Sequence, residues 1–265
     1  MASEGFSCSA SSMLAALVDG EVRELEEVAR TGVSVHYETG NAAVPLLSVG
    51  TPDAWQLPNS LITSTLPGTG SDAASHRITH GSTVGGGAFR HGGATWVVHR
   101  WWLPPRPHGL RPPRLGSTSG REISPRPSGV PRVRPSYDGL DPTSLLGAGP
   151  GLTPAGDDVL AGALVAAQAT DDPRLPDWRA SVLQLLRRRP TTAVSEAMLR
   201  CALDGFATPQ LADYVHAMCT AGTHTDPDVL DAATVNLLAV GSSSGAALMA
   251  GVLHTLTTAG MREAA

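Results

Sequence analysis

The sequence contains no lysine, and this absence excludes several kinds of chemistry. All 19 basic residues among its 265 are arginines, so neither a P-loop lysine nor a lysine Schiff base is available. Aromatic residues make up only 4% of the chain. The formal net charge is −5, which argues against a general nucleic-acid-binding protein.

Cysteines and long apolar runs are also scarce. Cys8, Cys201 and Cys219 are odd in number and have no metal-ligand spacing, so we expect free thiols in a reducing cytoplasm. No apolar run approaches the roughly 18 residues of a membrane span, and the first residues lack the pattern of a secretory signal. The sequence therefore predicts a cytoplasmic protein without a membrane segment.

The first region, residues 1–103, is predicted to be a helix followed by a β-rich part. Residues 1–12 are small and polar, so we expect them to be frayed. Apolar residues from Met13 to Arg30 recur at helical spacing. Later short apolar runs, separated by Gly, Pro, Asn and Asp, are typical of strands. The predicted strands are residues 33–37, 44–49, 60–65, 81–89 and 94–102.

Residues 104–136 have a different composition, with nine prolines, seven arginines and Glu122 as the single acid. Prolines disrupt both helices and strand ladders, so we expect a flexible, polyproline-like insert. A basic arm that contacts an anionic partner is the alternative. No aromatic residue lies between Trp102 and Tyr137 to stack on a base, which weighs against nucleic acid as that partner.

Residues 137–265 are predicted to be largely helical, because apolar residues recur at spacings of three, four and seven between Pro and Gly breaks. The predicted helices are residues 159–169, 178–189, 193–203, 209–219, 227–240 and 244–257. The sequence therefore predicts an α+β protein, in which a β-rich N-terminal half is followed by a largely helical C-terminal half.

The densest candidate site is the glycine-rich run from Leu145 to Gly162. Its glycines allow positive φ and close approach of a ligand. Thr153 before Pro154 is typical of a helix start, with Thr153 as the N-cap and Pro154 at the first helical position. Unpaired amides at such a helix N-terminus bind phosphates or carboxylates. A purely structural turn is the alternative. The substrate-binding residues expected in this run are Gly149, Gly151, Leu152, Thr153 and Gly156.

Asp157 and Asp158 follow in the first helical turn and are the candidate catalytic residues. Adjacent helical side chains point about 100° apart, so we expect one acid to face the ligand and the other to face solvent. The acid at the site would orient a substrate amide or, alternatively, hold Mg²⁺ through water. A structural role, in which both complement the helix dipole, is also open. No other cofactor is expected, since the histidines have no zinc-ligand spacing.

Two further clusters of hydroxyl groups lie at predicted helix starts. Thr191 and Thr192 are expected to cap a helix or to contact an anion. The run from Gly241 to Gly245 contains three serines that either cradle an anion or belong to a tightly packed helix start. These candidate binding residues are Ser242, Ser243 and Ser244.

The Gly149–Asp158 run, the threonine pair and the final Gly-Ser-Ser-Ser-Gly motif together resemble the AllH-type family, long described as a domain of unknown function. The resemblance covers residues 140–253 well and residues 20–103 weakly. One member of that family is a subunit of bacterial oxamate carbamoyltransferase, an enzyme of purine catabolism. The resemblance therefore implies transfer of a carbamoyl group between carbamoyl phosphate and the amide of a small oxo-acid, together with companion subunits.

The last motif departs from the family pattern, which usually reads Gly-His-x-Ser-Gly with an Asp two residues after the second Gly. Ser242 and Ala247 occupy those places here, so a potential general base and its orienting acid are missing. The resemblance implies an oligomer or complex member that binds a small anionic substrate. The alternatives are a non-catalytic scaffold or regulatory subunit, and a stand-alone tailoring enzyme with another substrate.

Overall fold

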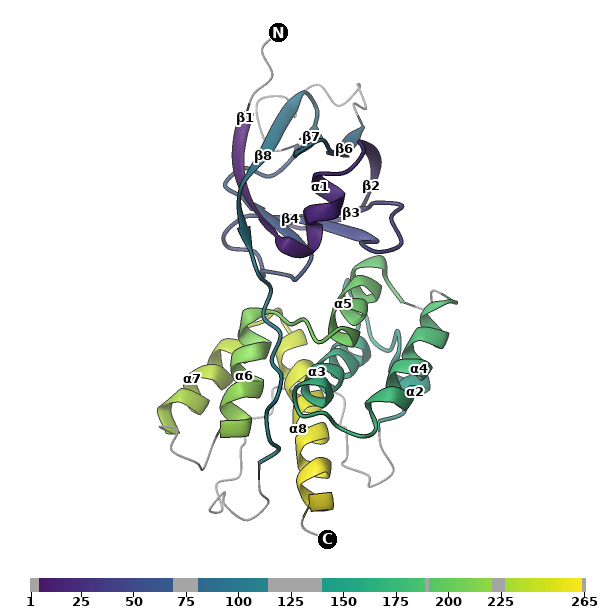
Figure 1. The fold of residues 1–265 in the computed structure, drawn as a ribbon, viewed down its shortest axis with the longest axis vertical. Helices are drawn as coiled ribbons and strands as arrows, with labels where there is room; N and C mark the ends of the chain where they lie inside the picture. The colour runs from purple at the N-terminus through teal and green to yellow at the C-terminus, as the bar shows by residue number, and fades with distance from the viewer. Residues whose placement is uncertain (1–4, 69–80, 114–139, 189–190, 221–226, 264–265) are drawn as a thin grey trace. The chain divides into compact units, whose positions relative to one another are not determined.

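A computed structural model describes residues 5–68, 81–113, 140–188, 191–220 and 227–263 of the chain (Figure 1). The chain divides into two compact units, Met1–Pro104 and Pro105–Ala265. All the strands of the described residues lie in the first unit, and the longer helices lie in the second. The predicted α+β class, with a β-rich N-terminal half and a helical C-terminal half, is confirmed.

The N-terminal unit is a closed barrel with the strand order β1-β5-β4-β3-β2-β6-β7-β8. Its strands are β1 (Gly5–Ser11), β2 (Arg23–Arg30), β3 (Ser34–Glu38), β4 (Leu46–Gly50), β5 (Ser60–Thr63), β6 (Ser82–Gly85), β7 (Ala88–His91) and β8 (Ala94–Trp102). β1 closes the barrel by pairing parallel with β8 and antiparallel with β5. Closure gives each strand a hydrogen-bonded neighbour on both sides.

Two expectations for the start of the chain are wrong. Among residues 1–12, expected to be frayed, residues 5–11 form β1, whose Cys8 and Ala10 alternate into the barrel core, whereas residues 1–4 lie outside the described residues. The helix expected over Met13–Arg30 is limited to η1 (Ser12–Leu14) and α1 (Ala15–Val18), and it gives way to β2. Ladder hydrogen bonds from β2 to β3 and β6 satisfy the backbone of this segment, and they override its helical spacing.

The centre of the barrel is built from aromatic side chains, although such residues are rare in the chain. Trp96 stacks on Phe6 with ring centroids 5.2 Å apart, and Phe89 contacts both Trp96 at 5.3 Å and Tyr37 at 5.4 Å. Buried side chains of η1 and α1 join the same core. The large area that each ring buries lets a few aromatic residues fill the barrel.

His36 is buried in the barrel with its ring between two serines. Its Nδ1 lies 2.9 Å from Ser48 Oγ, and its Nε2 lies 3.1 Å from Ser34 Oγ. Burial lowers the pKa of His36 to about 4, because the charged ring would lose its hydration. The folded barrel therefore keeps this ring neutral at mildly acidic pH.

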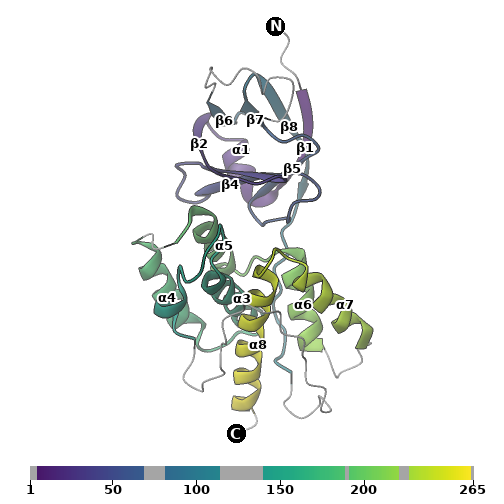
Figure 2. The same cartoon turned by 180° about the vertical axis from the view of Figure 1, so that it is seen from behind.

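The C-terminal unit is an assembly of helices around α3. Its helices are α2 (Pro142–Leu145), α3 (Ala155–Ala169), α4 (Leu175–Leu186), α5 (Ala193–Leu203), α6 (Pro209–Thr220), α7 (Pro227–Leu238) and α8 (Ser244–Glu263). α3 is buried along nearly all of its length and contacts α8, α5 and α4 (Figures 1 and 2). The six predicted helices correspond to α3–α8, with ends shifted by a few residues. Within the described ranges, none of these helices is long and apolar enough to cross a membrane.

The contact between α3 and α8 is so close that it requires glycine on both helices. A Cβ atom added at Gly162 would lie 2.1 Å from the carbonyl oxygen of Leu248, and one added at Gly251 would lie 2.0 Å from that of Val159. No side chain fits at such distances, so the two backbones touch directly. Both glycines pack against carbonyl oxygens that cannot move without distorting a helix.

Residues 105–113 are attached to the helical unit. The amide of Leu110 donates to the carbonyl oxygen of Ala169 at 2.8 Å. The Arg106 guanidinium lies 5.3 Å from the centre of the phenylalanine ring in the α5–α6 connection. The start of the predicted flexible insert is therefore tied to the helices by backbone and side-chain contacts. The remainder of that prediction, residues 114–136, lies outside the described residues.

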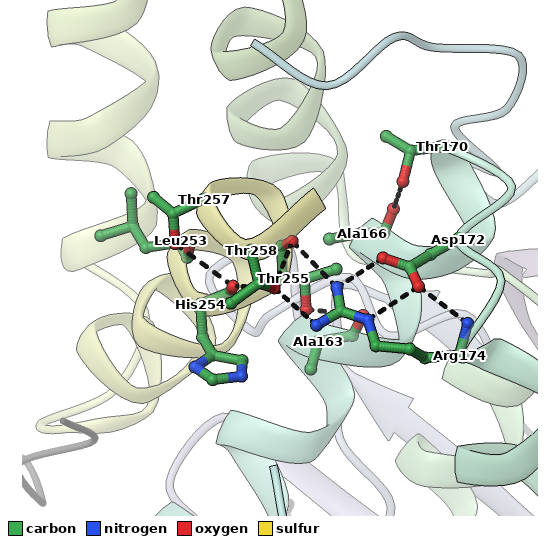
Figure 3. Close-up of polar contacts among 10 residues, drawn as sticks. All are labelled: Ala163, Ala166, Thr170, Asp172, Arg174, Leu253, His254, Thr255, Thr257 and Thr258. Carbon is green, nitrogen blue, oxygen red and sulfur yellow. Dashed lines mark hydrogen bonds and ion pairs between the residues drawn. The ribbon is translucent and has the colours of Figure 1, made fainter. Parts of the chain in front are cut away.

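A buried ion pair fastens the α3–α4 connection to α8 (Figure 3). The Arg174 guanidinium bonds the carboxylate of Asp172, with Nε 2.8 Å from Oδ1, and also donates to the Thr255 carbonyl at 3.1 Å and to the Thr258 hydroxyl. The Asp172 and Arg174 side chains are 1% and 13% exposed. Burial and the nearby Arg174 charge lower the pKa of His254, whose ring lies apart from these contacts.

The three cysteines are free, with Cys8 and Cys201 buried and Cys219 partly buried. Burial raises the pKa of the Cys8 and Cys201 thiols to about 12 and that of the Cys219 thiol to about 11. These thiols are therefore protonated at neutral pH, and a protonated thiol is a poor nucleophile and metal ligand.

Replacing Asp172 by alanine should lower the free energy of unfolding by about 3–5 kcal/mol, because it leaves the Arg174 charge buried without its counter-ion. The control is Asp204→Ala, which breaks the Arg179–Asp204 pair, whose side chains are 43% and 55% exposed. That change should cost less than about 1 kcal/mol. Urea unfolding followed by circular dichroism measures both values. Equally small losses in the two variants would contradict the prediction.

Acidification should destabilise the wild type more than the variant His36→Asn. The unfolded chain binds a proton at the ordinary histidine pKa of 6.5, whereas folded His36 does so only at about 4. The resulting stabilisation is complete above pH 6.5 and is lost as the pH falls toward 4, by roughly 3 kcal/mol at most. Melting curves across this pH range measure the difference between the two proteins. His99→Asn, at an exposed histidine, should retain the wild-type pH dependence. If His36→Asn retained it too, the prediction would fail.

Candidate functional site

The glycine-rich loop of the C-terminal unit connects α2 to α3. Gly147, Gly149 and Gly151 have φ values of 74°, 120° and 97°, which ordinary residues rarely adopt. Gly149 and Gly151 lie exposed at the tip of the loop. Gly156, in contrast, packs at the base of the loop, where an added Cβ would lie 2.0 Å from the carbonyl oxygen of Leu145. The loop thus has an accessible tip and a tightly packed base.

Asp157 holds the loop against the segment that precedes α5. Its Oδ1 accepts the amide hydrogen of Gly147 at 2.7 Å, and its Oδ2 accepts the hydroxyl hydrogen of Thr191. The residue is only 2% exposed. Hydrogen bonds to a buried carboxylate are strong, so this side chain connects α3, the loop and the start of α5. The sequence alone gave no sign of the contact between Asp157 and Gly147, which depends on the path of the loop.

Thr192 makes a second link between the loop and α5. Its hydroxyl donates to the Leu152 carbonyl at 2.6 Å and accepts the amide hydrogen of Ser195 at 3.1 Å. The second bond is the helix cap that the sequence predicted for this threonine pair. One hydroxyl group thus makes both bonds, so Thr192 caps α5 and at the same time holds the glycine-rich loop.

Thr153 connects the loop to the start of α8. Its hydroxyl lies 3.1 Å from the Ser244 hydroxyl. The prediction that Thr153 caps α3 is wrong, because the residue at the cap position is Pro154, which has no side-chain hydrogen bond there. Among the three serines proposed as binding residues, Ser244 is thus the one that contacts the loop. Ser242 is exposed in the turn before α8, and Ser243 is half-buried.

Asp158 lies beside this hydroxyl pair and is 9% exposed. Burial raises its pKa to about 7, the hydroxyls of Ser244 and Thr153 lower it through hydrogen bonds, and the adjacent Asp157 raises it. Its Oδ2 is buried without any hydrogen-bond partner. The expectation that one of the two acids faces solvent is wrong, because the loop, α5 and α8 cover both.

The backbone amides at the start of α3 are partly used within the chain. Gly156 donates its amide hydrogen to the Ala148 carbonyl at 2.8 Å, and Asp157 donates to the Pro154 carbonyl at 2.9 Å. Fewer amides are therefore available to an anion than at an open helix N-terminus. The features that could contact a ligand here are the exposed loop tip, the hydroxyl groups and the carboxylate of Asp158.

The described residues contain no group of three or more His, Cys, Asp or Glu side chains that could hold a metal ion. Asp157 and Asp158 form a pair of acids with different surroundings, since one has both oxygens engaged and the other has an open acceptor. This arrangement can accept hydrogen bonds from a ligand. Environments that separate two neighbouring acids in this way are common at functional sites.

Comparison with known families gives a match over residues 145–256, to the family described as "Oxamate carbamoyltransferase subunit AllH". The matched range begins at the glycine-rich loop and includes α3–α7 and most of α8. It therefore contains every residue of the candidate site. No solved structure matches the chain.

Replacing Asp157 by alanine should lower the free energy of unfolding by about 2–4 kcal/mol, because the half-buried Gly147 amide and Thr191 hydroxyl lose their shared, buried acceptor. Asp177→Ala is the matched control, since Asp177 also lies in a first helical turn but is exposed. It should cost less than about 1 kcal/mol through the helix dipole. Chemical denaturation measures both changes. Similar losses in the two variants would rule out the proposed role of Asp157 in holding the loop.

Proposed function

Residues 145–256 are AllH-like, and on this ground we propose that the chain is a carbamoyltransferase-related subunit that binds a small anionic substrate at its glycine-rich loop. The observation that carries the proposal is the convergence of three separate segments. The loop, the threonine pair before α5 and Ser244 at the start of α8 all meet around Asp157 and Asp158. These segments lie up to 91 positions apart in the sequence.

The anionic group of the substrate is proposed to bind at the loop tip, near Gly149 and Gly151. Backbone there is exposed and without side chains, so a phosphate or carboxylate can approach closely. The Thr153 hydroxyl, two residues after Gly151, lies 3.1 Å from that of Ser244, and both can turn their hydrogens toward an anion. Carbamoyl phosphate carries the negative charge that such a site would bind.

The chemistry proposed is transfer of a carbamoyl group. The nitrogen of an acceptor amide forms a bond to the carbamoyl carbon, the carbon–oxygen bond to phosphate breaks, and the amide proton leaves with a base. Such a reaction can be accelerated by positioning and electrostatic stabilisation without a covalent intermediate. In this proposal Asp158 is the catalytic acid or base, whereas Asp157 positions the loop, and Mg²⁺ would enter only with the substrate phosphate.

A second candidate function is a non-catalytic subunit of the same kind of complex. The departure of the last motif from the pattern that the resemblance implies favours it, because Ser242 and Ala247 stand where that pattern has a His and an Asp. Ala247 is fully buried, and its methyl group can neither accept a proton nor form an ion pair. A companion subunit would then supply the missing base, and the loop would contribute substrate binding alone.

Gly151→Val should abolish binding of carbamoyl phosphate and of phosphate while costing only about 1–2 kcal/mol of stability. A Cβ at Gly151 meets nothing within 4 Å, although its φ of +97° is unfavourable for valine. Gly109→Val is the matched control, because Gly109 is also exposed, has φ +65° and has nothing within 4 Å. Thermal shifts and calorimetric titration with millimolar ligand measure stability and binding.

The outcomes separate the two roles of the loop. Binding to the wild type and to Gly109→Val, but not to Gly151→Val, would support the proposed function. Unfolding of Gly151→Val would favour a purely structural turn. Failure of both ligands to bind the wild-type chain would count against the proposal, and failure of oxamate as well would overturn it.

A further inference from the structure

The carboxylate of Asp158 contains a buried acceptor that the chain itself does not use. We infer that Asp158 recognises the N–H₂ group of a carboxamide or carbamoyl ligand and so selects amides over ligands of the same shape and charge that lack N–H. This inference rests on the proposed function. It adds that the amide end of the substrate faces α3. Its basis is Oδ2 of Asp158, which lies buried without a hydrogen-bond partner in a residue only 9% exposed.

An unpaired buried carboxylate oxygen is costly, so its presence calls for an explanation. Leaving such an acceptor unsatisfied costs about 1–3 kcal/mol, and more for a charged group. The neighbouring Asp157 is also buried, at 2% exposed, but it has a partner for each oxygen. The difference between the two acids indicates that the open position at Asp158 is reserved for a donor that comes from outside the chain.

The charges around Asp158 favour an N–H donor over an anion. Asp157 adds a second carboxylate, which raises the pKa of Asp158 and would repel a phosphate placed at the same point. An amide N–H₂ brings two donors and no charge. It can therefore bond Oδ2 without the desolvation penalty of a buried cation. The anionic part of the same ligand would then lie toward the exposed loop tip at Gly149 and Gly151.

A zinc ion explains the open oxygen less well. Zinc sites in proteins have three or four protein ligands, and the described residues contain no group of three or more His, Cys, Asp or Glu side chains that could hold a metal ion. Hydrogen bonding by the Thr153 and Ser244 hydroxyls, which lie 3.1 Å from each other, lowers the pKa of Asp158, so both hydroxyls lie beside its carboxylate. A set of one carboxylate and two hydroxyls suits a small polar molecule with N–H and carbonyl groups.

For a ligand to reach Oδ2 of Asp158, the loop must separate from one of its two neighbours, and the contact with α8 is weaker than the contact with the α5 side. On the α5 side, the loop is held by the charged acceptor Asp157 and by the 2.6 Å bond of Thr192. On the α8 side, the contact between Thr153 and Ser244 joins two neutral hydroxyls at 3.1 Å. Neutral hydrogen bonds are about half as strong as charge-assisted ones. A ligand can therefore separate the second contact while the first keeps the loop in place.

Oxamate and pyruvate provide a direct test, because they have the same charge and similar shape and differ by an N–H₂ group in place of a methyl group. The full wild-type chain should bind oxamate at least about 10-fold more tightly than pyruvate, as expected for a hydrogen bond to a charged acceptor. Asp158→Leu removes the acceptor at similar volume and should abolish this preference. Asp158→Asn keeps one acceptor oxygen and should retain a preference of a few fold.

Calorimetric titration measures the affinities, and melting temperatures confirm that each variant is folded. Asp213→Asn, at an exposed acid on α6, should keep the wild-type preference. Phosphate binding is measured in the same samples and should persist in Asp158→Leu, since the inference assigns the anion to the loop tip. If Asp158→Leu does not fold, Asp158→Asn decides: its preference should fall from about 10-fold to a few fold, and an undiminished preference would overturn the inference.

Equal affinity of the wild type for oxamate and pyruvate, with phosphate still bound, would overturn the inference and leave the proposed function intact. A preference for oxamate that survives in both Asp158 variants would also overturn it, because another residue would then recognise the amide. Absence of binding by phosphate, carbamoyl phosphate and oxamate alike would overturn the proposed function, and the inference with it.

Discussion

The direct backbone contact between α3 and α8 is the constraint on which the rest of the C-terminal unit depends. Gly162 and Gly251 leave no room for a Cβ atom, so the two helices approach as closely as their backbones allow. This spacing brings Ser244, at the first turn of α8, within hydrogen-bonding distance of Thr153. Two glycines in the middle of the helices therefore determine the distance between two walls of the candidate site.

Asp157 and Asp158, in the first turn of α3, have separate roles because their side chains point toward different parts of the unit. The rotation of about 100° between adjacent helical residues turns Asp157 toward the loop and α5 and turns Asp158 toward α8. Asp157 finds a donor for each oxygen, and the contact has a structural purpose. Asp158 is also buried but keeps an open acceptor. Both side chains are thus buried, and the difference in hydrogen bonding separates a positioning residue from a candidate binding residue.

The sequence predicted the helical unit better than the start of the barrel. Helices α5 and α6 combine apolar residues at helical spacing with clear Pro and Gly breaks, and both lie where the pattern placed them. The residues of β2 have the same helical spacing, but strand pairing on both sides decided their conformation. β1 consists of small and polar residues, so its composition concealed the alternation of Cys8 and Ala10. Local patterns predict conformation well only where no distant strand competes for the backbone.

The sequence by itself determined the α+β order, the glycine-rich loop before a helix, a threonine cap at the start of α5 and the lack of any lysine chemistry. Only the tertiary structure decided that Thr153 meets Ser244 and does not cap α3, and that β1 closes the barrel against β8. It also decided which of the two acids has a free oxygen. The physical reason is that these features depend on contacts between residues distant in sequence and on burial, which local propensity does not encode.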